Sequence, residues 1–425
     1  VLFLIAGMLS SCVGNTQMGT LTIAVAESNP GVENETNAHS LYAGARLAAE
    51  QVNEAGGING YFLKIVPYAD KNETMGAKQN AQAIVQSGAL AVIGHSSSAT
   101  TSVAAPIYMN AGIPAINASP DSIKTMQQFP NYFNISYTSE QQGAYLANYT
   151  KRSLGIDRAT IVYTSDASAG ALAKKFENTF RGLGGTIVFM QEINGQSDTT
   201  ESQINDIVGR IFSVNSGILL IAANDFISSN LVIELKNRGF NNPIIGGDNL
   251  SSRGFLEKIQ NESAEQVHPG YYTDNMISTR ALLPDSASGF TSLFVRDFQL
   301  SYPGLPVSNS AARGYDAVLA IVKAIQTSQR SSEITQERAN IHAALLQMND
   351  PKTTFKGVTG PIYFDRNRNA VRQTLFGIYQ YGHLISAPLQ YEPILLPERI
   401  PNLGEQLDQG HIITLDGKYA YATNI

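Results

Sequence analysis

Short apolar strands alternate with amphipathic helices along the first hundred residues, and this alternation restricts the fold of the chain more than any other feature. Apolar residues in segment 39–53 recur at helical spacing, and Gly56-Gly57 ends that helix. Segment 89–94 is instead an almost continuous apolar run, as expected for a parallel strand covered on both faces. The predicted strands are 21–26, 62–66, 89–94 and 113–116, and the predicted helices are 39–53, 76–86 and 98–110. This order is typical of a doubly wound α/β unit.

The same alternation begins again near residue 140 and predicts a second α/β unit of similar size. Its predicted helices are 141–153, 169–183 and 227–238, and its predicted strands are 159–163, 186–190, 218–221 and 243–245. A chain of 425 residues is long enough for two or three domains. Two such lobes, with no obvious flexible linker between them, predict a cleft, and clefts between domains are favoured binding pockets.

The N-terminal residues carry a processing signal. An apolar run, Val1 to Leu9, leads into Leu9-Ser10-Ser11-Cys12, and Cys12 is the only cysteine of the chain. This order resembles a bacterial lipobox, which implies that Cys12 becomes the lipid-modified first residue of the mature protein. A secretory signal starts with basic residues, so we expect the sequence to begin inside the signal. The alternative is a short buried apolar run with an incidental thiol.

Charge and composition exclude several classes of function. The net charge is −6 and no basic block is present, which argues against a nucleic-acid partner. No run after the N-terminus approaches the 18 apolar residues of a membrane-spanning helix. The six histidines are scattered without the spacing of a zinc site, so we expect no metal and no cofactor.

Two loops carry the best candidates for a binding site. Ser97 and Ser98 lie between the apolar strand at 89–94 and the following helix. Hydroxyl groups beside the free N–H groups of a helix start bind a carboxylate, although helix capping by serine explains the same residues. Asp248 follows the strand at 243–245 and could accept an ammonium group, or it could be a solvated loop carboxylate. Together the two loops would suit a zwitterion held between the lobes.

His95 lies close to Ser98 in sequence, which raises the possibility of a serine hydrolase. The Gly-x-Ser-x-Gly turn of such enzymes is absent, and no orienting acid can be assigned. We therefore do not expect an enzyme. The segment 365–369 is superficially like a calcium loop, but it lacks the glycine and glutamate of that motif, so a polar hairpin turn is expected there.

An ordered set of five segments resembles a known family. The segments are 44–60, 92–98, 112–116, 314–317 and 355–365. In this order they resemble the type I periplasmic binding proteins, in particular the leucine/isoleucine/valine-binding receptors of ABC transporters, over roughly residues 19 to 390. The resemblance implies two Rossmann-like lobes with parallel sheets, joined by three crossovers near 137, 272 and 374. It also implies a venus-flytrap hinge that closes around an amino acid.

This resemblance divides the chain into four parts. Residues 1–18 are the signal and tether, 19–137 with 273–373 form the first lobe, 138–272 with 374–392 form the second lobe, and 393–425 form a C-terminal extension. The extension has no assigned role. A hairpin is expected near its end, with Asp416-Gly417 at the turn.

The resemblance also assigns roles to individual residues. It implies that Ser98 holds the ligand carboxylate through its hydroxyl and N–H, while the backbone carbonyl of Ser119 and the carboxylate of Asp248 hold the ammonium. Asp121 stands where the family has a Thr or Ser that donates to the carboxylate. Asn224 stands where an aromatic side chain often covers the ligand.

The expected ligand pocket departs from that of a receptor for aliphatic amino acids. Ala169 replaces a common tyrosine, and Ala311 lies near another aromatic position. Polar residues are expected around the site at Ser96, Ser97, Asn224 and Arg313. Because a branched aliphatic ligand needs an apolar wall, we expect a ligand that is polar or larger than leucine.

The sequence therefore predicts an extracytoplasmic solute-binding lipoprotein, anchored by lipid at the cell membrane or in the periplasm. It would capture an amino acid or a related small polar molecule for the permease subunits of an ABC importer. The alternative is a ligand-binding sensor domain whose closed state is recognised by a receptor partner.

Overall fold

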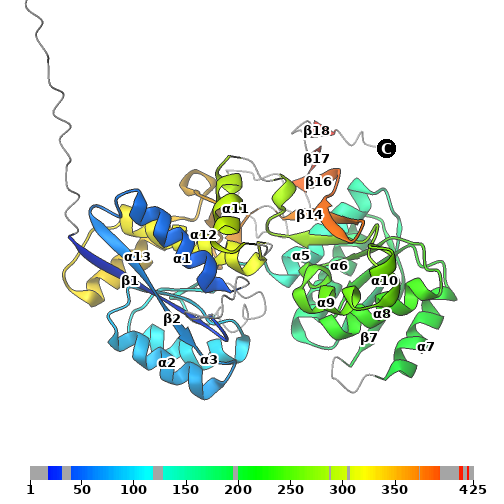
Figure 1. The fold of residues 1–425 in the computed structure, drawn as a ribbon, viewed down its shortest axis with the longest axis horizontal. Coiled ribbons are helices and arrows are strands. Elements are labelled where there is room, and N and C mark those ends of the chain that lie inside the picture. The colour runs from blue at the N-terminus through cyan, green and yellow to red at the C-terminus, as the bar shows by residue number, and fades with distance from the viewer. Residues whose placement is uncertain are drawn as a thin grey trace, which may run out of the picture.

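The computed structural model describes residues 18–30, 40–117, 128–194, 200–286, 289–303, 307–372, 374–392, 411–414 and 419–420. Two α/β lobes lie side by side (Figure 1), each built on its own sheet. The predicted fold class, two lobes with parallel sheets, is confirmed.

The first lobe contains a sheet of five strands, all parallel, in the order β2-β1-β3-β4-β5. These strands are β1 Gly19–Glu27, β2 Tyr61–Ala69, β3 Ala91–Gly94, β4 Ala115–Asn117 and β5 Tyr132–Asn134. Its helices are α1 Leu41–Glu54, α2 Thr74–Gln86, α3 Ser98–Asn110, α11 Phe290–Ser301, α12 Asn309–Thr327 and α13 Ile334–Gln347.

Helices cover both faces of the first sheet, as the apolar run of β3 predicts. Alternate residues of β1 point to opposite faces of the sheet. Ile23 and Val25 lie in the core that includes residues of α1 and α12, whereas Ala24 and Ala26 lie in a second core with α2 and α3. In the order β2-β1-β3 the strand order reverses between β1 and β3. Ligands of open α/β sheets bind beyond the carboxyl ends of the strands at such a point.

The second lobe contains a sheet of seven strands in the order β15-β14-β10-β9-β8-β6-β7. Strands β6 to β10 are parallel, and the edge strands β14 and β15 are antiparallel, so this sheet is mixed rather than purely parallel. The strands are β6 Arg158–Thr164, β7 Thr186–Ile193, β8 Ile218–Ala222, β9 Ile244–Gly246, β10 Ile277–Arg280, β14 Leu375–Gln380 and β15 His383–Ser386.

Six α-helices of the described residues pack on this second sheet. They are α5 Ser139–Asn148, α6 Ala167–Gly182, α7 Glu201–Phe212, α8 Asp225–Asn237, α9 Arg253–Gln260 and α10 Ser263–Val267. The helix expected at 141–153 is an α-helix only as far as Asn148 and continues as a π-helical turn, Tyr149–Ser153. Tyr149 in that turn stacks on Phe376 at 3.9 Å between ring centroids.

The second passage between the lobes lies later in the chain than the resemblance implies. Strand β10 pairs with both β9 and β14, so it belongs to the second sheet. The chain therefore leaves the second lobe after Arg280, and the expected crossover near 272 is wrong. The strand Ile-Ser-Thr-Arg lacks a clear apolar pattern, because its partners in the sheet, rather than its own sequence, determine its conformation.

Two small antiparallel sheets complete the structure. Strands β11 Phe355–Gly357, β12 Gly360–Phe364 and β13 Ala370–Val371 form one, and the β12–β13 connection is the hairpin turn expected at 365–369. Strands β16 Leu389–Glu392, β17 His411–Thr414 and β18 Tyr419–Ala420 form the other. The pairing of β17 with β18 confirms the strands of the C-terminal hairpin, while its Asp416-Gly417 turn lies outside the described residues.

Candidate functional site

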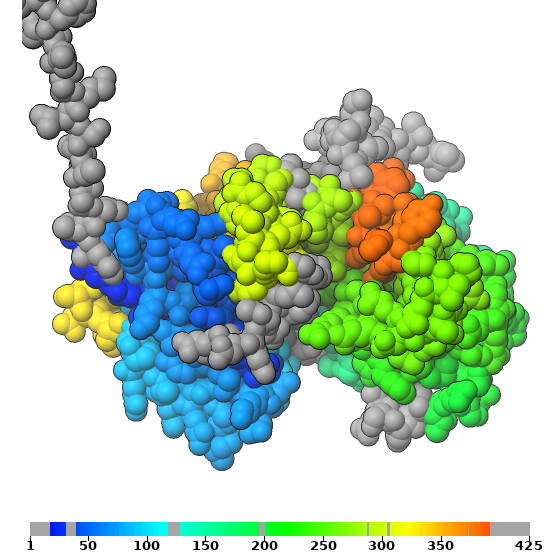
Figure 2. Space-filling view, in the orientation of Figure 1, coloured from blue at the N-terminus to red at the C-terminus, as the bar shows by residue number. Residues whose placement is uncertain are grey.

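A cleft of about 1650 Å³ lies between the two lobes. Figure 2 shows the blue and cyan part of the first lobe beside the green second lobe, and the cleft lies between the two lobes. Its lining includes Asn29, Ser98 and the start of α12 from the first lobe, and loops that follow the parallel strands from the second. Most of the lining residues are polar, as the sequence analysis predicts.

The wall of the second lobe is made where four parallel strands end. Asp166 follows β6, Asn224 follows β8, Asp248 follows β9 and Arg280 is the last residue of β10. Because the carboxyl ends of parallel strands meet at one edge of a sheet, these side chains face one cleft. Asn224 and Asp248 were predicted from the sequence, whereas Arg280 was not, since the β10 strand that positions Arg280 was not predicted.

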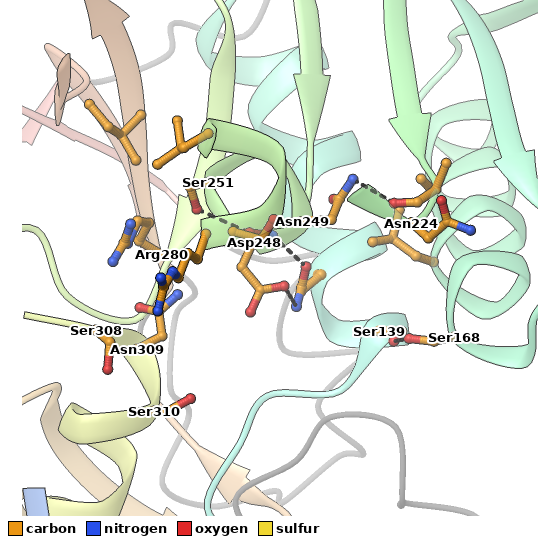
Figure 3. Close-up of a pocket in the computed structure, with 18 of the residues that line it drawn as sticks. Ser139, Ser168, Asn224, Asp248, Asn249, Ser251, Arg280, Ser308, Asn309 and Ser310 are labelled. Atoms are coloured by element: carbon orange, nitrogen blue, oxygen red, sulfur yellow. Dashed lines mark hydrogen bonds between the residues drawn. The ribbon is translucent and has the colours of Figure 1, made fainter. Parts of the chain in front are cut away.

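Asp248 is held in place by neighbouring side chains (Figure 3). The Gln142 side-chain amide donates to Asp248 Oδ1 at 3.2 Å, and the Asp248 N–H donates to Gln142 Oε1 at 3.3 Å. The Ser251 hydroxyl donates to the Asp248 carbonyl at 3.1 Å. The Asp248 side chain is 24% exposed, and its Oδ2 lies 3.8 Å from Arg313 Nη1. Asp248 is therefore an anchored carboxylate that faces the cleft, not a freely solvated one.

The serines at the start of α3 have separate roles. Ser97 is the N-cap: its hydroxyl oxygen accepts from the Thr100 N–H at 3.3 Å and hydrogen-bonds the Thr100 hydroxyl at 2.8 Å. Ser96 Oγ accepts from the Ser28 N–H at 3.1 Å. Ser97 therefore caps the helix and does not line the cleft, whereas Ser98 lines the cleft. The structure brings Ser98, Asn224 and Asp248 together around one cleft.

Three residues singled out in the sequence cannot be placed. Ser119, Asp121 and Cys12 lie outside the described residues. Their roles stay predictions.

His95 has a structural role. It is fully buried, and its Nδ1 lies 2.6 Å from Asp70 Oδ2 while its Nε2 lies 3.0 Å from the Tyr108 hydroxyl. Both ring nitrogens are therefore engaged, and neither serves Ser98 as a base. Burial raises the pKa of the Tyr108 hydroxyl well above its ordinary value, so that hydroxyl stays protonated.

The aromatic positions of the expected pocket are occupied by small or polar residues. Asn224 caps α8, with its Oδ1 accepting from the Ile227 N–H at 3.0 Å. Ala169 also lines the cleft, but Ala311 is fully buried where α12 packs on α1. Among the described lining residues Tyr379 is the only Phe, Tyr or Trp, and its hydroxyl donates to the Leu250 carbonyl at 2.8 Å.

Two arginines from different lobes approach the cleft near Asp248. Arg313 of α12 is 7% exposed, and besides its contact with Asp248 it donates to Ser136 Oγ and to Ser310 Oγ, both at 3.3 Å. Arg280 of β10 donates through Nη2 to the Val307 carbonyl at 3.4 Å. The sequence analysis named Arg313 only as a polar neighbour of the site.

A third arginine lies beneath these two. Arg372 is 3% exposed, and its guanidinium carbon lies 5.0 Å from the centroid of the Tyr137 ring. Burial lowers the pKa of Arg372, although the nearby Tyr137 and Asp316 act in the opposite direction. Burial also raises the pKa of the Tyr137 hydroxyl well above its ordinary value, and that hydroxyl lies within the electrostatic range of Asp248 and all three arginines.

The described residues contain no group of three or more His, Cys, Asp or Glu side chains that could hold a metal ion. Among the helices of the described segments, none is both long enough and apolar enough to cross a membrane.

Comparisons with known proteins agree with this architecture. A family model described as "Periplasmic binding protein" matches residues 20–380. A Pseudomonas aeruginosa "Amino acid binding protein" is 27% identical over 252 residues, which are 57% of this chain and 66% of the relative. The "Leu/Ile/Val-binding protein" of Escherichia coli K12 is 24% identical over 225 residues, 53% of this chain and 60% of the relative. The chain thus spans less than two thirds of the length of these curated relatives.

Solved structures share the fold. A branched-chain amino acid transporter substrate binding protein from Streptococcus pneumoniae, in complex with isoleucine, superposes with a TM-score of 0.68 at 23% identity, covering 86% of this chain and 97% of the other. An ABC transporter substrate-binding protein from Desulfitobacterium hafniense, in complex with Leu, has a TM-score of 0.67 at 23% identity, covering 87% and 100%.

Proposed function

Because the chain belongs to the periplasmic binding protein family, we propose that it captures an amino acid, or a related small polar molecule, outside the cytoplasm and delivers it to an ABC importer. The observation that carries this proposal is that Ser98 of one lobe and Asp248 of the other line the same cleft. The names of the relatives, which refer to amino acids, support the same ligand class.

The two ends of an amino acid match the two walls of the cleft. The first turn of α3 presents N–H groups and the positive end of the helix dipole, which favour a carboxylate. Asp248 supplies a carboxylate for the ammonium, and Gln142 keeps it oriented. In this arrangement the Ser119 carbonyl would also accept from the ammonium, and Asp121 would lie beside the ligand carboxylate.

Ligand binding is expected to close the lobes. Pockets that hold small molecules enclose about 300–1,000 Å³, and this cleft is larger, at about 1650 Å³. An amino acid therefore cannot contact both walls fully unless the lobes approach each other. A ligand drives such a change only through its higher affinity for the closed state.

A thermal-unfolding screen of the protein against the common amino acids, small amides and short acids tests the function. A true ligand at 100 times its dissociation constant is expected to stabilise the fold by roughly 2.7 kcal/mol. Small-angle scattering with the ligand that stabilises most is expected to show a smaller radius of gyration. A screen in which no amino acid or related molecule raises the melting temperature would contradict the proposal, and an unchanged radius at saturation would contradict closure.

We also propose that Cys12 anchors the protein to a membrane by a lipid, on the basis of its lipobox-like context. Replacing Cys12 with alanine is expected to release the protein from membranes in cells that process lipoproteins. Cell fractionation measures the release, and mass spectrometry of the wild-type N-terminus measures the acyl groups. Equal membrane retention of both proteins, with no acyl mass on the wild type, would exclude the anchor.

A further inference from the structure

The three arginines that line the cleft differ in their partners. Arg253 forms an ion pair with Glu257 at 2.6 Å, and Arg313 lies 3.8 Å from Asp248. Arg280 forms no ion pair with any of the described residues, and its Nη2 donates a hydrogen bond to the Val307 backbone carbonyl at 3.4 Å. Arg280 is therefore a cation in the cleft without an anionic partner in the described part of the chain.

The remaining carboxylate in the lining, Asp166, forms no ion pair with Arg280. Asp166 is the N-cap of α6: its Oδ1 accepts from the Ala169 N–H at 2.9 Å and its Oδ2 from the Thr164 hydroxyl at 2.5 Å. It is thus engaged at the start of its own helix. Because the other two carboxylates face Arg253 and Arg313, none of the three lining carboxylates forms an ion pair with Arg280.

Several guanidinium nitrogens near Arg280 are also buried without a hydrogen-bond partner among the described residues. They are Nε of Arg280, Nε of Arg313, and Nε and Nη2 of Arg372. Leaving buried donors of a cation unpaired is unfavourable, and most such groups in folded proteins are paired. Arg280 and Arg313, which line the cleft, therefore keep guanidinium donors without an acceptor among the described residues, whereas Arg372 is not part of the lining.

These arginines come from different parts of the fold. Arg280 ends β10 and Arg372 follows β13, close to where the chain passes between the lobes, whereas Arg313 lies in α12 of the first lobe. Figure 3 shows Arg280 on the side of the cleft toward Ser308 and Asn309 at the start of α12, with Asp248 beside it. An anion bound by Arg280 and Arg313 would therefore contact both lobes at once.

We propose that the ligand of this cleft is an amino acid with a second carboxylate, and that Arg280 and Arg313 bind its side-chain carboxylate. The planar guanidinium group matches a carboxylate and binds it through paired, charge-assisted hydrogen bonds. The inference rests on the proposed function, because Ser98 and Asp248 bind the α-carboxylate and the ammonium. Beyond that function, it specifies that the side chain of the ligand is negatively charged.

Calorimetry of the full chain with L-glutamate, L-aspartate and L-glutamine tests the inference. Glutamine has the size of glutamate but no side-chain charge, so the ratio of their affinities isolates that charge. The wild type is expected to prefer one of the acidic amino acids over glutamine by at least about tenfold. Arg280→Gln is expected to weaken binding of the acidic ligand by at least about tenfold and to change glutamine affinity by less than about twofold. Arg280→Lys should retain part of the preference, since it keeps the charge.

Arg253→Gln is the matched control. It removes the same charge from the same cleft, but from an arginine that already faces Glu257, so the preference for acidic ligands is expected to persist.

Wild-type protein that binds leucine or glutamine at least as tightly as both acidic amino acids would overturn the inference and leave the proposed function standing. Equal loss of glutamate and glutamine in Arg280→Gln, with unchanged thermal unfolding, would also overturn it. Binding of no amino acid at all would refute the proposed function and the inference with it.

Discussion

Asp248→Ala is expected to weaken binding of the amino acid ligand by at least about tenfold, or 1.4 kcal/mol. A hydrogen bond between charged groups contributes about 1.5–3 kcal/mol, and a buried ammonium left without its acceptor costs more. Ser98→Ala is expected to do less, because the backbone N–H of Ser98 remains. Calorimetry with the amino acid and with its deaminated analogue measures both effects.

The contact of Asp248 with Arg313 makes this test more specific. Removing Asp248 takes a negative charge away from Arg313, whose Nη1 lies 3.8 Å from it. The deaminated acid, which carries only negative charge, should therefore bind the variant at least as well as the wild type, while the amino acid binds worse. Glu257→Ala serves as the control, because Glu257 is a cleft carboxylate paired with Arg253. If Asp248→Ala weakened both ligands equally, Asp248 would not bind the ammonium.

Gly314→Ala is expected to lower the free energy of unfolding by about 3 kcal/mol, at the upper end of the usual cost of overpacking a core. Gly314 lies where α12 packs on α1, and a Cβ there would lie 2.0 Å from the backbone carbonyl oxygen of Leu41. A Cβ on Gly44, on the facing helix, would lie 1.7 Å from the carbonyl oxygen of Ala311. Because both obstacles are backbone atoms, a side-chain rotation cannot relieve the overlap, and the helices must separate.

Gly209→Ala is the matched control for this effect. Gly209 is exposed within α7, and a Cβ there would meet nothing within 4 Å. Glycine is less favourable than alanine within a helix by about 0.5–1 kcal/mol, so the control is expected to gain about that much stability. Urea unfolding monitored by circular dichroism compares the variants. A Gly314→Ala protein as stable as the wild type would show that α1 and α12 do not pack this closely.

Local sequence was sufficient to predict much of both α/β units as far as residue 245, but not α7 or the helices that follow residue 245. Apolar runs of strand length and apolar residues at helical spacing identified both α/β units, since these patterns reflect which faces an element buries. The helix at Ser98–Asn110 was predicted with its observed bounds. The strand β10 was missed, because Ile-Ser-Thr-Arg becomes a strand through pairing with β9 and β14 rather than through its own pattern.

The sequence by itself determined the two lobes, the helix start beside Ser98 and the position of Asp248 after a parallel strand. Each of these depends on residues close together in the chain. Only the tertiary structure assigned capping to Ser97, engaged His95 with Asp70, and brought Arg280 and Arg313 to the cleft. Those outcomes depend on which buried charges and donors find partners across elements distant in sequence. Burial and ion pairing act through space, and the order of residues alone does not specify them.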